Sequence, residues 1–253
     1  MILKDNSTFL CEKARKAICL FWKKSKHFGK LPPQIMIHSY NTLIRPILLY
    51  GSDVWGFSKN AWESIDKVCK WFIRCIINVK PTTSNLITFG EVGIFPPSLY
   101  SKINVMLYFI RVKSMGENTI AKIVFNELER LDDIGFKNWV SNVNDLAGEF
   151  GIALHNLENT GACIDQIKKT VMSQYENKWL KNINNIDVNP LLRTYRLFKD
   201  KFFLEPYLIH VKNDKHRIAL SKFRCSSHML EIERGRYTNP ITPIVNLEIP
   251  KLG

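Results

Sequence analysis

Apolar residues recur along most of the chain at the three- and four-residue spacing of α-helices. The first apolar stripe predicts a helix near residues 10–24 and consists of Leu10, Ala14, Ala17, Ile18 and Phe21. Four basic residues fall away from this stripe: Lys13, Lys16, Lys23 and Lys24. The pattern therefore predicts an amphipathic helix with an apolar inner face and a basic outer face.

The next two helices are framed by residues that typically begin and end helices. Pro33 suits a helix start and Gly51 a helix end, while Pro46 between them predicts a kink. The face of this second helix is predicted to contain Met36, Tyr40, Leu43, Ile44 and Ile47. A third helix is predicted from Ser58 or Asn60 to Pro81, with a dense apolar face of Ile65, Val68, Cys69, Phe72, Ile73, Ile76 and Ile77.

The remaining chain continues the helical pattern, and alternation typical of strands is nearly absent. The segment "TFGEVGIFPP" at 88–97 has two glycines and two prolines, so we expect a loop there. Weakly patterned segments at 150–163 and 182–190 are candidate linkers. Further helices are predicted at 98–115, 118–131, 137–149, 163–184, 190–203 and 213–229. The expected fold class is all-α.

Positive charge is concentrated near the two ends of the chain. The net charge is +13 over 253 residues. Residues 1–30 have eight lysines and arginines against two acidic residues, and residues 191–237 have eleven against five, so the rest is nearly neutral. A strongly basic surface favours anionic partners, with nucleic acid the first expectation.

The six cysteines form no C-x-x-C pair and no framework of short spacings. We expect free, reduced and mostly buried thiols, as in a cytoplasmic or nuclear protein. The N-terminal segment becomes polar within four residues, unlike a secretory signal, and no apolar run is long enough to span a bilayer. We expect a protein that is neither secreted nor in contact with a membrane.

Catalytic motifs are absent from the sequence. The only adjacent carboxylates, Asp132 and Asp133, lie at a predicted helix end without a neighbouring strand, where acidic residues are common in turns. The chain has no G-x-S-x-G, P-loop, G-x-G-x-x-G or H-E-x-x-H motif. Cys225 and His228 have the C-x-x-H spacing of two zinc ligands, yet no further cysteine or histidine follows to complete a four-ligand site. We therefore expect no metal and no cofactor.

Basic helical faces are the remaining candidate for chemistry. On a helix, Arg217, Ser221, Arg224 and His228 fall on one stripe within about 60° of arc. The apolar residues Ala219, Leu220, Phe223 and Leu230 cluster on another side, which we expect to be buried. The preceding helix repeats the arrangement, with Leu191, Tyr195, Phe198 and Phe202 towards the core and Arg193 and Arg196 opposite. Such stripes could contact phosphates, although charged runs are more often simply solvated faces.

Four ordered blocks resemble the region downstream of the palm in reverse transcriptases of non-LTR, LINE-like retrotransposons. They are "YNTLIRPILLYGSDVWG" (40–56), "TFGEVG" (88–93), "LLRTYRLFKDKFFLEPYL" (191–208) and "RIALSKFRCSSHMLEIERGRY" (217–237). The resemblance covers nearly the whole chain, and its first and last blocks are the most specific. No block is a catalytic signature.

The resemblance implies a thumb-like helical bundle in residues 1–116, linker helices with a basic C-terminal end in 117–237, and an irregular tail in 238–253. In that family the thumb grips the template–primer duplex, so the implied partner is the backbone of RNA or DNA, bound without sequence preference. The residues implied at this interface are Arg45 and the basic residues near 13–26, together with Arg217, Arg224, Arg234 and Arg236. Other retroelement proteins are implied as further partners.

Two departures from the family limit what the resemblance implies. The fingers and palm, with their aromatic-x-Asp-Asp motif, are missing, and "TNPITPIVNLEIPKLG" replaces the terminal Cys/His element. We therefore expect a fragment that is not an enzyme on its own. The alternatives are a non-functional relic, or a scaffold that binds protein through exposed apolar faces. The scaffold would use an aromatic-rich region that contains Tyr50, Trp55, Trp62, Trp71, Phe72, Tyr108 and Phe109.

Overall fold

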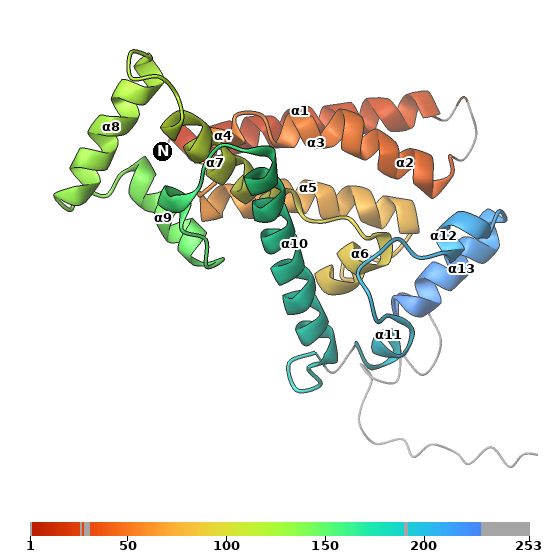
Figure 1. The fold of residues 1–253 in the computed structure, drawn as a ribbon. Coiled ribbons are helices and arrows are strands. Elements are labelled where there is room, and N and C mark those ends of the chain that lie inside the picture. Colours follow the sequence, from red (N-terminus) through yellow and green to blue (C-terminus); the bar gives the residue numbers. More distant parts are fainter. Residues whose placement is uncertain (1, 26, 28–30, 190–191, 229–253) are drawn as a thin grey trace, which may run out of the picture.

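The computed structural model describes residues 2–25, 27, 31–189 and 192–228. Within those residues every regular element is a helix and there is no strand, which confirms the all-α fold class (Figure 1). The predicted boundaries near residues 116 and 237 remain predictions.

The N-terminal helices form a bundle around one central helix. The first helix, α1 (Ile2–Ser25), packs along α5 (Lys59–Ile77), and the two run side by side in Figure 1. Between them in sequence lie α2 (Pro33–Ser39), the π-helix η2 (Tyr40–Ile44), α3 (Arg45–Leu48) and α4 (Ser52–Trp55). The irregularity predicted at Pro46 is a π-helical turn directly before α3, where the backbone N–H of Arg45 bonds to the carbonyl of Tyr40.

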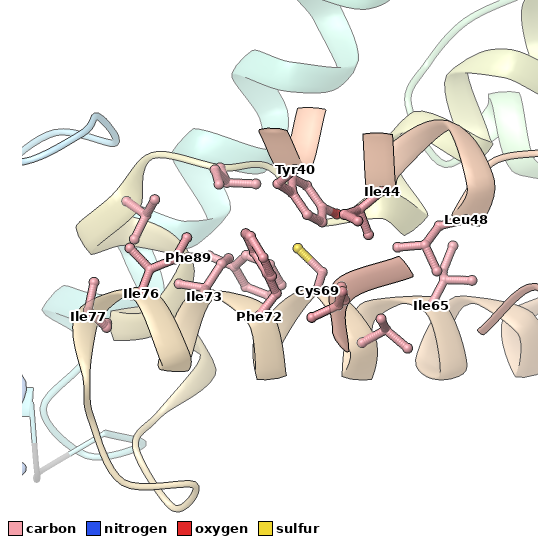
Figure 2. Close-up of a cluster of buried hydrophobic side chains, with 14 of the residues drawn as sticks. Tyr40, Ile44, Leu48, Ile65, Cys69, Phe72, Ile73, Ile76, Ile77 and Phe89 are labelled. Atoms are coloured by element: carbon pink, nitrogen blue, oxygen red, sulfur yellow. The ribbon is translucent and has the colours of Figure 1, made fainter. Parts of the chain in front are cut away.

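The apolar stripe of α5 forms the centre of the first hydrophobic core. All seven residues predicted for that stripe are buried. Figure 2 shows Ile65, Cys69 and Phe72 of this helix facing Tyr40, Ile44 and Leu48. The rings of Tyr40 and Phe72 stack with centroids 5.3 Å apart.

The segment predicted as a loop at residues 88–97 is largely helical. Helix α6 spans Asn85–Val92, with the Ser84 side chain accepting a hydrogen bond from the N–H of Leu86 and Gly93 closing the helix at φ 64°. Gly90 lies inside this helix. A side chain is excluded at this position because a Cβ would stand 2.4 Å from Cζ2 of Trp179. The prediction was wrong because this glycine provides room for a distant tryptophan rather than a turn.

A second core lies on the other side of the molecule. It is built from α7 (Pro97–Lys113), α8 (Ile120–Asp133), α9 (Trp139–Gly148), the 3₁₀ turn η3 (Leu154–Asn156) and α10 (Gly161–Asn184). Phe109 is fully buried at its centre against Phe125 and Trp139. Helix α8 lies at one extremity of the molecule in Figure 1.

The C-terminal helices return to the first core. They are α11 (Arg193–Phe198), α12 (Tyr207–His210) and α13 (Asp214–Arg224), and they are shorter than the helices predicted at 190–203 and 213–229. Their buried residues Tyr195, Leu208 and Cys225 belong to the same hydrophobic cluster as α1 and α5. Helices from the two basic ends of the sequence therefore pack into the same hydrophobic core.

Candidate nucleic-acid interface

The outer side of α1 has four exposed lysines, Lys13, Lys16, Lys23 and Lys24, which we call the lysine face. At 100° per residue these four positions lie within about 100° of arc. Exposed Phe9 and Leu20 lie among them, and the Lys13 ammonium is 4.3 Å from the centre of the Phe9 ring. The predicted orientation of this helix is confirmed.

The inner side of α1 explains why the lysines point outwards. Leu10, Ala14 and Ile18 are almost completely buried in the first core. Phe21 and Trp22 contact the ring of Phe72 on α5. Because these contacts fix the rotation of the helix, the lysine face must point towards solvent. Glu12, at the edge of this face, is its acidic neighbour.

Arg45 lies on a different helix and has a different environment. It is half-buried, and its guanidinium stands 4.5 Å from the centre of the Tyr100 ring. The contact joins α3 to α7. Arg45 therefore has a packing role, and the structure does not place it on the lysine face.

The predicted orientation of α13 is wrong. Leu220 and Phe223, predicted to be buried, are 37% and 44% exposed, and Ala219 is exposed too. Ser221, predicted to face phosphates, is 1% exposed. Its hydroxyl donates to the carbonyl of Arg217 and accepts a hydrogen bond from the hydroxyl of Tyr207 at 2.9 Å. The stripe that includes Arg217, Ser221 and Arg224 is therefore the inner face of the helix.

Both arginines of this stripe have partners within the protein. Arg217 forms an ion pair with Asp214 in the first turn of α13 and donates to the carbonyl of Val211 at 3.0 Å. The guanidinium of Arg224 donates from Nε to Oε1 of Glu91 at 2.6 Å and lies 2.7 Å from Oε2 of Glu205. Glu91 comes from the middle of the chain, in α6, and is fully buried.

Lys199 completes this buried charged cluster, which consists of Glu91, Lys199, Glu205 and Arg224. The ammonium of Lys199 lies 2.5 Å from Oε1 of Glu205 and donates to the carbonyl of Phe203 at 2.7 Å. Two carboxylates thus face two cations. Burial opposes the charge of Arg224, but its bonds to the two glutamates outweigh that effect and raise the pKa of the guanidinium. The cluster attaches the C-terminal segment to α6.

Of four other predicted residues, only Arg196 has a side chain that the structure describes. Arg196 is half-buried and donates to the carbonyls of Ile183 and Asn189, at 3.1 and 3.0 Å. The Arg193 side chain, Arg234 and Arg236 lie outside the described residues. Phe198, predicted to be buried opposite these arginines, is 47% exposed, whereas Tyr195 is buried as predicted.

Cys225 and His228 differ in exposure, since the cysteine is buried and the histidine is half-buried. Cys225 is buried, and burial together with the nearby Glu91 raises the pKa of its thiol. The His228 ring stacks on Phe223 with centroids 5.8 Å apart. No group of three or more potential metal ligands comes together within the described residues.

The acidic pair in α8 has a structural contact. The Oδ1 atom of Asp132 accepts a hydrogen bond from the hydroxyl of Ser141, in the first turn of α9. Asp133 is exposed at the end of α8. All six cysteines are free, and four of them are buried, in agreement with the prediction.

Sequence patterns gave no sign of a cavity of about 480 Å³ beside the C-terminal end of α1. Its lining is mostly apolar and aromatic, with Trp22, Met36 and Trp71 from the first bundle and Ile218 from α13. Arg217 also lines it, but this side chain is already paired with Asp214. The cavity therefore lacks the unpaired cations that a phosphate would need, and the lysine face remains the candidate interface.

A scan against protein-family models and searches of curated proteins and of solved structures found no match. None of the helices in the described part of the chain combines the length and the apolar character needed to cross a bilayer. The fold therefore defines the chain as an all-α protein. The function of this protein has to be inferred from its surfaces.

Proposed function

We propose that the protein binds the backbone of RNA or DNA without sequence preference, through the lysine face of α1. The supporting observation is the projection of four exposed lysines from one side of a helix whose other side is fixed in the core. Lysine ammonium groups serve as point contacts for phosphates, and such contacts do not distinguish sequences.

The proposal includes the family relation suggested by the sequence blocks. The chain would be a helical unit homologous to the thumb and linker of a non-LTR reverse transcriptase, without catalysis of its own. A thumb that grips a duplex needs a rigid helical body with an exposed cationic side, and α1 fits that requirement. Four residues that the sequence suggested for the interface, Arg45, Arg217, Ser221 and Arg224, belong in this proposal to the structural framework instead.

A salt titration tests the proposal. Purified protein would be titrated against duplex and single-stranded probes of unrelated sequence, and the affinity followed by filter binding as the salt is raised. If four phosphates are neutralised, affinity for a duplex should fall on the order of 100-fold between about 50 and 200 mM salt. The probes should differ little by sequence. No binding at low salt, or micromolar binding that does not change with salt, would contradict the proposal.

The alternative of a protein-binding scaffold rested on the aromatic residues of positions 40–110. Trp55, Phe72 and Phe109 are buried, so three of the seven cannot form a docking surface. Tyr50 and Trp71 are 74% and 39% exposed. Among the described residues the most exposed aliphatic side chain is Ile120 in α8, outside this region, and it directs attention to a different kind of contact.

A further inference from the structure

Helix α8 leaves much of its apolar side exposed to solvent. Ile120 is 82% exposed, Ile123 55% and Val124 52%. Just beyond the helix end, Ile134 and Phe136 are 58% and 65% exposed. An apolar face that a helix does not bury against its own chain is typical of a surface that contacts another molecule. This surface is independent of the lysine face and of the function proposed for it.

A pair of opposite charges lies between the two apolar ends of this face. The guanidinium of Arg130 donates two hydrogen bonds to the carboxylate of Glu127, at 2.6 and 3.0 Å. Both side chains are more than half exposed. At 100° per residue, the helical positions of Ile120, Ile123, Glu127, Arg130 and Ile134 fall within about 80° of arc. The outward side of α8 is thus apolar, then charged, then apolar again.

This order is complementary to itself when one copy is reversed. If two α8 helices pack antiparallel with Glu127 opposite Arg130 of the second copy, Arg130 is opposite the second Glu127. The same register places Ile123 opposite Ile134, and Ile120 near the segment that contains Phe136. A twofold axis between the helices then matches both Glu127–Arg130 contacts and both Ile123–Ile134 contacts at once.

We propose that α8 is a self-association surface, on which a second copy of this chain docks its own α8 in antiparallel orientation. The two Glu127–Arg130 pairs combine into a group of four alternating charges, and isoleucines pack on either side of it. The charges select the partner and the register, because a neighbour without the matching pair would leave them opposite like or uncharged groups. The isoleucines supply the apolar area that association removes from water.

The size of the surface sets the strength of the contact. One helix per copy buries an area at the low end for protein interfaces, below about 1,200 Å² in total. The net charge of +13 also opposes contact between copies. We expect a reversible dimer that appears as the protein concentration is raised, in the absence of nucleic acid.

Charge exchange provides the test, with sedimentation velocity across a concentration series as the measurement. Glu127→Arg gives each copy two arginines, and Arg130→Glu gives each copy two glutamates, so either variant should raise the dimer dissociation constant at least about tenfold. The double variant E127R/R130E restores complementarity and should return the constant to near that of the unmodified chain. An equimolar mixture of the two single variants should form the heterodimer.

A control of equal charge is available on α10. Glu176 is exposed there, so Glu176→Arg changes the net charge as E127R does and should leave dimer formation unaltered. Circular dichroism should give the same helicity for every variant, because the altered side chains are exposed. A chain that remains monomeric at all concentrations would overturn the proposal. So would a single variant that still forms the dimer, or a mixture that remains monomeric.

Discussion

The two basic ends of the sequence have the same net charge but very different structures. In α1, four lysines lie exposed on the outer side of the helix, from Lys13 to Lys24. In the C-terminal region the side chains of Lys199, Arg217 and Arg224 turn inwards to carboxylates and carbonyls. Equal charge therefore implies neither equal exposure nor an equal role.

The difference follows from the available partners. The buried side of α1 meets apolar side chains of α5, which exclude its lysines from the interface between the two helices. The inner side of α13 meets Glu91 and Glu205, buried carboxylates that need a cation nearby. A planar guanidinium can bond to two such groups at once, whereas a hydrated ammonium is more stable in water. The use of arginine at position 224, between Glu91 and Glu205, agrees with this geometry.

The largest expected effect is the loss of stability on removing Arg224. Arg224→Ala leaves Glu91 buried without its cation and leaves Glu205 with Lys199 alone. The loss of one partner of a buried ion pair costs about 3–5 kcal/mol, so the free energy of unfolding measured with urea should fall by that amount. Lys215→Ala, at an exposed position of the same helix, should change it by less than about 0.5 kcal/mol.

A second variant separates the ion pair from the packing around it. In E91Q/R224M both charges are removed and the volume is kept, so this variant should be more stable than R224A, because no buried carboxylate in α6 is left uncompensated. A loss below about 1 kcal/mol in R224A, accompanied by weaker nucleic-acid binding, would instead assign Arg224 to the interface.

Neutralising the lysine face should produce the next largest effect, in binding and not in stability. In K13Q/K16Q/K23Q/K24Q the affinity for a duplex at low salt should fall on the order of 100-fold, about 2.7 kcal/mol, because four phosphate contacts are lost. The slope of log affinity against log salt should decrease by about 3.6. Filter binding measures both quantities.

The matched control removes four exposed lysines elsewhere, in K137Q/K169Q/K181Q/K201Q. It has the same net charge, so a smaller loss in the control than in the lysine-face variant would locate the interface on α1. Equal losses in the two variants would show that total charge, and no particular face, governs binding. Thermal unfolding of both should match that of the unmodified chain.

The sequence was sufficient to predict the orientation of α1 and α5 because their two sides differ sharply in polarity. In α5 all seven predicted core residues are buried, and in α1 the lysines alternate with the core stripe at helical spacing. Burial of apolar side chains fixes the rotation of such helices whatever they pack against. Here local pattern and tertiary structure agree.

The orientation of α13 could not be predicted from local pattern, because each of its two sides has both apolar and polar groups. The side with Leu220 and Phe223 is more apolar, yet the arginine side is buried against carboxylates, and one of them, Glu91, is 133 positions from Arg224. Arginine also has an apolar stem that packs well in such a place. Helix α6 was missed for a related reason, since the need for Gly90 depends on Trp179 in α10.

The smallest expected effect concerns Arg217, the arginine of α13 that is bonded within its own segment. Its ion pair with Asp214 is partly exposed, and its second hydrogen bond is to the Val211 carbonyl. Arg217→Ala should therefore lower the free energy of unfolding by only about 1 kcal/mol, measured with urea. Asp214→Asn tests the pair alone and should cost less than R217A, because the hydrogen bond to Val211 survives. If R217A instead leaves stability unchanged and reduces the salt slope of duplex binding by about one, Arg217 contacts phosphate, and the contrast between the two basic regions applies to Arg224 and Lys199 only.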